Sequence, residues 1–507
     1  MPITNKSILP HVSFVLFILF FISTFSSSVV AVDNPCDPDF VSIDANGGFF
    51  VSPSMDTSGV TDTSNLQCVH NAIENQSFHA VKLNSGNFFI KEVTLNCPPS
   101  KACTFAGSTR SGTIVDVVDD SIDCQGSFDN NVVPGGLRFR GRVLVQFFTI
   151  RGDSPCMTDR VLPGLLVFTG KPAVVGNECE NSVLFGNLNR VDVIAHSWDV
   201  DAGVLVTPQG RYIYEGVCQD GLSGSFTSTR TYVDGPWFGI LASMHAGARI
   251  GIHFFESVNS RVGIEILDSN AITAVNFCKI TGTAAANNDF QGVAVTRFEG
   301  SPNTTTTSVN KCTFDISSDP EAFGAIGVNV QDFGPPSNML TVVSSNIFNL
   351  MGTATFGMEF GDVSNCTATA NTFSGNVGFG ITIFDYGASP SGCTVTANKG
   401  FAGTSVFYVH IYASPGTFDN VLGLHPGAIV LDDGCNFDLN APGGGCALGG
   451  GDPFKNSVSA KSPESVASGQ RGHGRSRAIG YRTKSGRKAG AKSGYILSKR
   501  NNSQITD

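Results

Sequence analysis

Long apolar runs are scarce in this sequence of 507 residues. Beyond residue 31, no stretch reaches the roughly 18 to 20 uninterrupted apolar residues that a membrane-spanning helix needs. Lys6 precedes an apolar run from Val12 to Ile22, and small residues follow up to Ala31. This pattern predicts a signal peptide over residues 1–31, cleaved after Ala31, and therefore a secreted protein without a transmembrane segment.

Sequence motifs of several common enzyme sites are also missing. The chain has no HExxH motif, no paired CxxC motifs, no GxSxG motif with a plausible triad and no Walker-type phosphate loop. Metalloprotease, α/β-hydrolase and nucleotide-binding functions therefore have no support in the sequence.

Helix-forming patterns are rare, whereas Gly, Ser, Thr, Asn and Val are abundant, which favours strands joined by turns. The 14 cysteines all lie beyond the signal peptide and predict disulfides in an oxidising compartment. Sequons at Asn75, Asn303, Asn365 and Asn501 would carry glycans in a eukaryotic secretory route. These features agree with a secreted glycoprotein.

Positive charge is concentrated at the C-terminus. Residues 452–507 hold 12 Lys and Arg against 3 Asp and Glu, which leaves 20 against 39 for the rest of the chain. Low apolar content and an excess of like charges predict a disordered basic tail over 451–507, after a folded domain at 32–450. Such a tail is first of all a solvated extension. It could also bind an acidic polysaccharide or the acidic body of the protein itself, and the export signal argues against nucleic acid.

Short alternating strands recur from residue 239 to 433 at intervals of 20 to 35 residues. The first and third residues after the start of each unit are apolar, as in Ile264 and Ile266, which is typical of a half-buried strand. Units of this length cannot bury a core alone, so they predict stacked coils with parallel sheets. Regular coils are expected over 239–433, and the stretch 160–236 is either irregular coils or an insertion.

A second phrase in most units places an asparagine at one equivalent corner of the coil. The residues are Asn276, Asn310, Asn346, Asn371 and Asn398, with His253 in the first unit. Asparagine tolerates a left-handed backbone and can bond to its neighbours along a stack. The same phrase brings Cys366 one coil from Cys393, and Cys278 one coil from Cys312, close enough for disulfides.

Near the N-terminus, "TSNLQCVHNAI" from Thr63 is typical of an amphipathic helix with Leu66, Val69 and Ile73 on one side, within a cap over about 56–75. With the strand phrases after it and the repeats, the chain resembles the secreted right-handed parallel β-helix proteins of the pectate-lyase-like superfamily. The resemblance implies an all-β, right-handed parallel β-helix with an N-terminal helical cap. Catalytic motifs of pectate lyases, polygalacturonases and mannuronan epimerases are missing, so no catalytic residue is carried over.

Outward side chains of successive units are expected to form columns. The column at the second residue of each unit is Leu241, Glu265, Ala294, Asn329, Glu359, Thr382, His410 and Val430. The column at the fifth residue is Met244, Asp268, Arg297, Asp332, Asp362, Asp385, Ala413 and Asp433. Acids at strand ends often only bond to turn backbone, and an arginine among acids often only forms an ion pair, so these structural interpretations stay open.

The catalytic hypothesis places an acidic groove on these columns. Its members are Asp332, Glu359, Asp362 and Asp385, with Arg297 and His410 as the cation and base of uronate β-elimination. Hydrolysis would need two carboxyls about 5 Å or about 6.5 to 9.5 Å apart. Asp332, Asp362 and Asp385 could also bind Ca²⁺ as a cofactor.

The leading functional hypothesis is thus a secreted, monomeric protein that acts on an extracellular, acidic polysaccharide as a lyase or glycoside hydrolase. The alternative is a non-catalytic cell-wall, matrix or adhesion protein that binds glycans along its surface.

Overall fold

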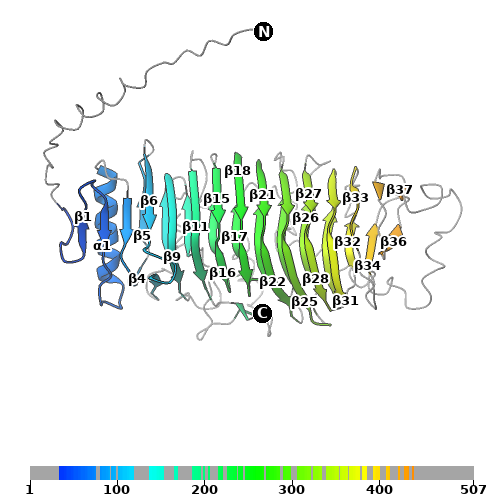
Figure 1. The fold of residues 1–507 in the computed structure, drawn as a ribbon, viewed down its shortest axis with the longest axis horizontal. Helices are drawn as coiled ribbons and strands as arrows, with labels where there is room; N and C mark the ends of the chain where they lie inside the picture. Colours follow the sequence, from blue (N-terminus) through cyan, green and yellow to red (C-terminus); the bar gives the residue numbers. More distant parts are fainter. Residues whose placement is uncertain are drawn as a thin grey trace, which may run out of the picture.

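The computed structural model describes residues 34–438 with gaps, of which the longest are 119–135, 153–164 and 170–184. Within these limits the chain is a right-handed parallel β-helix whose coils stack along one axis (Figure 1). The predicted fold class is therefore confirmed. The predicted signal peptide and basic tail lie outside the described residues.

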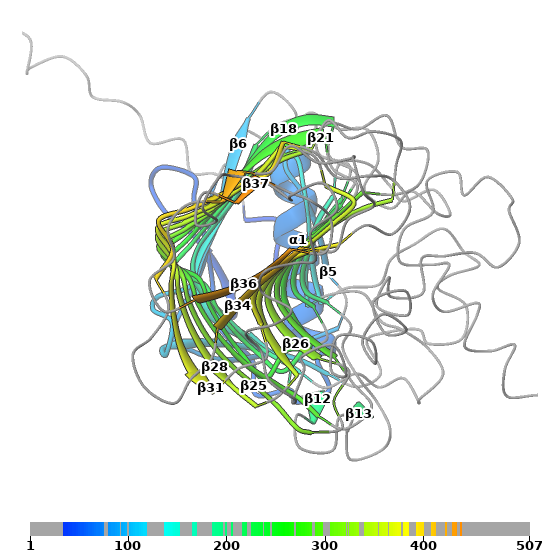
Figure 2. The same cartoon turned by 90° about the vertical axis from the view of Figure 1, so that its right-hand side faces the viewer.

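Each coil has three faces, which enclose one core when the molecule is viewed down its axis (Figure 2). Face 1 is a sheet of 12 parallel strands. Its strands are β5 (Val93–Asn96), β8 (Leu137–Arg140), β10 (Leu166–Thr169), β14 (Glu215–Asp220), β17 (Phe238–Ser243), β20 (Val262–Leu267), β23 (Asp289–Arg297), β26 (Gly324–Asp332), β29 (Thr355–Gly361), β32 (Phe379–Phe384), β34 (Phe407–Ile411) and β36 (Ala428–Asp432).

Faces 2 and 3, together with β1 (Val41–Ile43), form a sheet of 23 strands. Face 2 consists of β2 (Phe49–Val51), β3 (Ala80–Leu83), β6 (Ala102–Ala106), the first halves of β9 (Arg142–Arg151) and β11 (Phe185–Ile194), β15 (Ser225–Thr229), β18 (Ala246–His253), β21 (Asn270–Asn276), β24 (Thr306–Asn310), β27 (Leu340–Ser344), β30 (Cys366–Thr369), β33 (Thr394–Thr396), β35 (Val421–Leu422) and β37 (Phe437–Asp438). Face 3 consists of β4 (Gly86–Ile90), β7 (Thr113–Val117), the second halves of β9 and β11, β16 (Tyr232–Asp234), β19 (Glu256–Val258), β22 (Lys279–Ala284), β25 (Thr313–Ser318), β28 (Ile347–Met351) and β31 (Thr372–Asn376).

Two antiparallel pairs accompany the coils. β1 (Val41–Ile43) pairs with β2 at the N-terminal end, and β12 (Trp198–Asp199) pairs with β13 (Val204–Leu205). The stretch 160–236, in which the sequence period is lost, contributes β10 and β14 to face 1 and β11, β15 and β16 to the other two faces.

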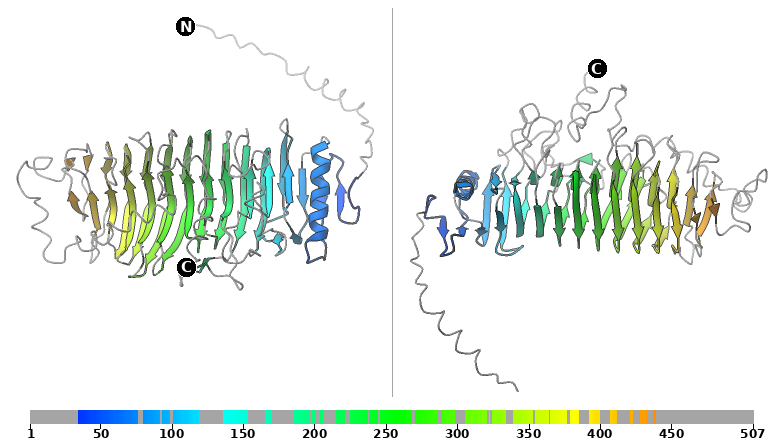
Figure 3. Two further views of the ribbon diagram at one scale, coloured as in Figure 1. Left: turned by 180° about the vertical axis from the view of Figure 1, so that it is seen from behind. Right: turned by 90° about the horizontal axis from the view of Figure 1, so that it is seen from above.

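Helix α1 (Val60–Asn75) lies across the N-terminal end of the stack (Figure 3). Its side chains accept hydrogen bonds from backbone N–H groups of the first coil. Asp62 accepts from Phe89 at 2.8 Å, and His70 Nδ1 accepts from the N–H of Asn96 at 2.9 Å. Since an open sheet edge exposes unpaired backbone groups, these bonds make α1 the cap that the sequence predicted. No helix among the described residues is long and apolar enough to cross a membrane.

The core is formed by inward side chains of all three faces, and its rings stack from coil to coil. Phe348 lies between two other rings of face 3, with centroid distances of 4.8 Å to Phe314 and 5.0 Å to Phe373. A Cβ on Gly327, which opens one repeat unit, would lie 2.7 Å from a ring carbon of Phe348. The repeated glycine is therefore needed because the stack passes close to the backbone.

From β9 to β33, the coils turn from face 2 to face 3 through one residue with a positive φ, between 53° and 63°. These residues are Phe147, Arg190, Arg230, Phe254, Phe277, Lys311, Ser345, Ala370 and Ala397. The predicted asparagines share this corner but occupy two positions. Asn276 and Asn310 precede the left-handed residue, whereas Asn346, Asn371 and Asn398 follow it. The two predicted disulfides, Cys278–Cys312 and Cys366–Cys393, are both present.

The three asparagines after the turn form a buried ladder. Asn371 Oδ1 accepts from the backbone N–H and the side-chain amide of Asn346, both at 3.0 Å. Asn371 Nδ2 donates to the Val343 carbonyl at 2.9 Å and to Asn398 Oδ1 at 2.9 Å. The ladder thus satisfies polar groups that the turn leaves inside the core.

His253 pairs in register with Asn276, and its Nδ1 lies 3.3 Å from Asn276 Nδ2, as its place in the repeat predicted. Burial lowers the pKa of His253 below its ordinary value of 6.5. Near and below pH 6.5 the unfolded chain therefore binds more protons than the folded chain. The free energy of unfolding falls as the pH is lowered through this range.

His253→Asn introduces the residue found at this place in the next two coils. We expect the melting temperature of this variant to fall less than that of the wild type when the pH is lowered from 7.5 to 5. Thermal unfolding of both proteins at the two pH values measures the effect. Because all other titrating groups are shared, an identical pH dependence in the two proteins would contradict this role of His253.

Candidate active site

The predicted column at the second residue of each unit lies on face 1. The register pairs, in order, Leu241, Glu265, Ala294, Asn329, Glu359, Thr382 and His410. The column ends on Leu431 instead of the predicted Val430, because β36 is shifted by one residue relative to the spacing read from the sequence. The strand residues on either side of Glu359, Met358 and Phe360, belong to the core, so Glu359 points away from it.

Glu359 has hydrogen-bonding side chains on both neighbouring strands. It pairs with Asn329 on β26 and with Thr382 on β32. Glu265, the other carboxylate of the column, lies between Leu241 and Ala294, which are apolar. Glu359 therefore sits in the more polar environment of the two, and both carboxylates are only 1 % exposed.

Arg297 and Asp332 form a buried ion pair at the ends of β23 and β26. Arg297 Nε donates to Asp332 Oδ1 at 2.7 Å, and Nη2 donates to Oδ2 at 3.0 Å. The side chains are 2 % and 0 % exposed. This is the structural interpretation that the sequence left open for Arg297, and the two-point contact fixes both groups. A catalytic role for either residue stays a prediction.

The remaining predicted site residues are only partly described. Asp362 follows β29 in a left-handed conformation with a φ of 55°, which aspartate tolerates in turns. Asp362 occupies the same position as Asp332 one coil further along, since the preceding residues, Gln331 and Gly361, pair with each other. Asp385 and the His410 side chain lie outside the described residues. In the part of the chain that the structure describes, no three acidic, histidine or cysteine side chains are grouped to hold a metal, and the Ca²⁺ set that includes Asp385 stays a prediction.

A chain of hydrogen bonds beside this column was not predicted from the sequence. Arg261 Nε donates to Asp289 Oδ1 at 2.8 Å, Gln291 Nε2 donates to Asp289 Oδ2 at 3.1 Å, and Asn329 Nδ2 donates to Gln291 Oε1 at 3.0 Å. Asp289 and Gln291 precede the glycine that marks the repeat, and β23 begins three residues before that glycine. A signal was available, because polar residues alternate at 289 and 291, directly before the strand predicted from Gly292.

A further outward column runs just before the repeated glycines. Its members in register are Phe238, Val262, Gln291, Ile326 and Phe356. The four apolar members are buried but lie outside the interior core cluster. Face 1 therefore carries an apolar strip beside the polar column of Glu359.

Several polar atoms on face 1 have no hydrogen-bond partner among the described residues although they are buried. They include Asn329 Oδ1, Gln331 Nε2 and Thr382 Oγ1. These atoms belong to β26 and β32, the two strands that flank Glu359. A buried polar group without a partner costs about 1 to 3 kcal/mol, so such a cluster calls for an explanation.

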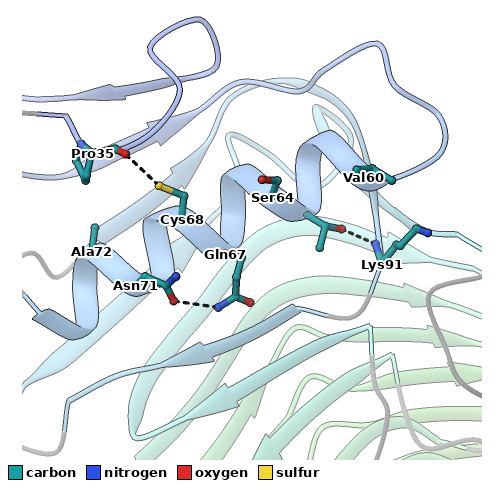
Figure 4. A pocket seen from close by; sticks show the side chains of 9 residues that line it. Pro35, Val60, Ser64, Gln67, Cys68, Asn71, Ala72 and Lys91 are labelled. Atoms are coloured by element: carbon teal, nitrogen blue, oxygen red, sulfur yellow. Dashed lines mark hydrogen bonds between the residues drawn. The ribbon is translucent and has the colours of Figure 1, made fainter.

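A pocket on the outer side of α1 is a weaker candidate. Val60, Ser64, Gln67, Asn71 and Lys91 are among its lining residues (Figure 4). Among the described residues, its lining contains no carboxylate and no imidazole, the groups that most often transfer protons in catalysis.

No protein-family model matches this sequence, and no curated protein is similar to it. Among solved structures, the Dettilon tailspike protein is 15 % identical with a TM-score of 0.47, over 76 % of this chain and 68 % of its own. The catalytic domain of a GH87 alpha-1,3-glucanase in complex with tetrasaccharides is 10 % identical with a TM-score of 0.42, over 80 % and 70 %. The Agl-KA catalytic domain is 11 % identical with a TM-score of 0.35, over 73 % and 66 %.

Proposed function

We propose that this protein acts on a polysaccharide at the outer side of face 1 and that Glu359 is the carboxylate that transfers the proton. The observation that carries the proposal is the row Asn329, Glu359 and Thr382, in register on three successive strands. Within this column, as far as the structure describes it, Glu359 is the carboxylate with hydrogen-bonding side chains on both neighbouring strands.

The unpartnered atoms around Glu359 suit a ligand rich in hydroxyl groups. Asn329 Oδ1 accepts hydrogen bonds, Gln331 Nε2 donates them and Thr382 Oγ1 does both. Sugar hydroxyls also donate and accept, so one sugar ring could satisfy several of these atoms at once. Of the apolar strip, Ile326 and Phe356 lie on the strands of Asn329 and Glu359, so these two side chains would contact the C–H groups of the same ring once the buried face is opened.

Two reactions are compatible with these groups. In β-elimination of a uronate, Glu359 removes the C5 proton, the C4–C5 double bond forms as the C4–O bond breaks, and the leaving oxygen takes up a proton from solvent, while a cation such as Arg297 balances the sugar carboxylate. In hydrolysis, protonated Glu359 gives its proton to the leaving oxygen, and a second carboxylate activates the water that attacks the anomeric carbon. Both oxygens of Asp332 are already bound to Arg297, which makes Asp332 less suited to be that second carboxylate.

The burial of Glu359 sets a condition on both reactions. Because 1 % of Glu359 is exposed, a polysaccharide reaches it only if the surface that shields it opens. Burial also strengthens the electrostatic interactions of the site once the substrate is bound.

We place this activity outside the cell. The predicted signal peptide and the disulfides, including Cys36–Cys68 and Cys97–Cys103 near the cap, support that location. An acidic polysaccharide remains the substrate class we infer, and the monomeric state remains a prediction.

The test is incubation of the full chain with pectate, alginate and neutral glucans, each with and without Ca²⁺. Absorbance near 235 nm detects the unsaturated product of a lyase, and new reducing ends without that absorbance indicate a hydrolase. Dependence on Ca²⁺ would support the predicted metal set. No product from any substrate would overturn the catalytic proposal.

The alternative is a non-catalytic protein that binds glycans. The near-complete burial of Glu359 and Asp332 favours this alternative. It predicts retention on an immobilised polysaccharide without any product in the same panel.

A further inference from the structure

The outer corner between faces 2 and 3 carries a row of aromatic rings and cations on six successive coils. We call it the corner ridge, and it consists of Phe147, Arg190, Arg230, Phe254, Phe277 and Lys311. All six are the left-handed residues of their turns, so their side chains project at the same corner. Phe254 and Phe277 are 51 % and 46 % exposed, which is high for phenylalanine.

The rings and cations of the corner ridge stack on one another. The Phe254 and Phe277 rings are parallel within 9° at a centroid distance of 5.1 Å. Arg230 Cζ lies 5.6 Å from the Phe254 ring centre and Lys311 Nζ lies 5.0 Å from that of Phe277. Arg190 Cζ lies 5.6 Å from the ring of Phe147. A guanidinium stacked on a ring keeps its N–H edge available, so the stack fixes these cations without using up their hydrogen-bonding capacity.

The three cations of the ridge have no carboxylate partner among the described residues. Some other cations of the described coils are paired with acids, as Arg110 is with Asp192 and Lys279 is with Glu256. Arg190 and Arg230 occupy adjacent coils, about 4.8 Å apart along the axis, where like charges repel. An anion that bridges them would remove this repulsion.

On its face 2 side, the strip beside the ridge is free of acids. On its face 3 side lie Asp192 and Glu256, which form ion pairs with Arg110 and Lys279. The residues that precede the ridge positions are Gln146, Asn189, Thr229, His253, Asn276 and Asn310. The outward residues two positions earlier are Leu144, Asn187, Thr227, Gly251, Ala274 and Ser308. The ridge and its face 2 strip therefore carry a net positive charge, whereas the chain before its tail holds 39 acids against 20 bases.

We propose that the corner ridge binds an anionic polysaccharide that runs along the axis of the coils. Arg190, Arg230 and Lys311 contact its carboxylates, and the amides and hydroxyls of the neighbouring strip bind its hydroxyls. The coil step of about 4.8 Å is close to the length of one sugar residue, so successive uronates meet successive coils. The choice of a polysaccharide over another polyanion rests on the proposed function, whereas the anionic character rests on the ridge alone.

The test uses the full chain and the variant Arg190→Gln/Arg230→Gln/Lys311→Gln. We expect its affinity for polygalacturonate at low salt to fall about tenfold or more, which corresponds to about 1.4 kcal/mol. The control variant Lys82→Gln/Lys101→Gln/Arg142→Gln removes the same charge elsewhere and should bind within about twofold of the wild type. An equal loss in both variants, or no loss in the ridge variant, would overturn the proposal.

Arginine footprinting locates the contact independently of the predicted basic tail. Polygalacturonate should protect Arg190 and Arg230 from phenylglyoxal, whereas Arg142 should react as in the free protein. Absence of protection at Arg190 and Arg230 rejects the site. Stronger protection by single-stranded DNA, or equal protection by a neutral glucan, rejects the acidic polysaccharide as its ligand.

These outcomes are separable from those of the proposed function. Product formation depends on Glu359 on face 1, and binding depends on a different side of the coil. A protein that forms no product but protects Arg190 and Arg230 refutes the catalytic proposal alone.

Discussion

Glu359→Gln is expected to lower the rate of polysaccharide cleavage by about 10²- to 10⁴-fold, the usual contribution of one general acid or base. Glutamine has nearly the same shape as glutamate, but it cannot exchange a proton. The loss should therefore appear in the rate of product formation, with little change in the melting temperature. Initial rates on the most active substrate of the panel measure it.

Glu265→Gln is the matched control for this prediction. Glu265 lies in the same column and is equally buried, but its neighbours in register are Leu241 and Ala294. We expect it to retain the wild-type rate within a few fold. Equal losses in both variants would show that burying an amide on face 1 disturbs the site nonspecifically. Full activity in Glu359→Gln would exclude Glu359 as the proton-transferring group.

Asn371→Leu is expected to destabilise the fold by about 2 to 6 kcal/mol, since two buried backbone groups would lose their partners at about 1 to 3 kcal/mol each. Asn371 is fully buried. Leucine has a similar size, but it leaves the Asn346 N–H and the Val343 carbonyl without the bonds that Asn371 provides. The urea concentration at the unfolding midpoint should fall accordingly.

Asn310→Ser is the control, because it introduces the residue type that the next coil has at this position, Ser344. Asn310 donates to Asn276 Oδ1 at 3.2 Å and accepts from the Ser344 hydroxyl, but it is only half-buried. Water can replace its partners, so we expect a loss below about 1 kcal/mol. If the two substitutions lowered the free energy of unfolding equally, the buried ladder would not stabilise the fold more than the half-buried asparagines do.

Alternation within single strands made much of face 1 predictable. Ile264 and Ile266 point into the core, and the residue between them points out, because successive side chains of a strand alternate. The sequence therefore predicted the column that contains Glu359 and, by phase, both disulfides between coils. It misplaced the end of that column at Val430, because a shift of one residue between coils leaves the alternation of each strand unchanged.

The corner asparagines show a second limit. Asn310 and Asn346 occur in similar phrases, "SVNKC" and "SSNIF", yet one precedes and the other follows the left-handed residue of its turn. The number of residues between the face 1 strand and this corner differs from coil to coil. Sequence spacing alone could therefore place both at the corner but could not decide which of them enters the core.

The sequence by itself determined that this chain is a stack of parallel coils with a helical cap, because period, alternation and amphipathicity are local properties that each segment carries. Only the tertiary structure decided which side chains become neighbours across coils. Arg297 meets Asp332 in a buried ion pair, and Arg190 and Arg230 meet on the corner ridge although the stretch around them shows no period. The reason is physical: contacts between coils depend on the register that each turn adopts, and turns of unequal length hide that register from the sequence.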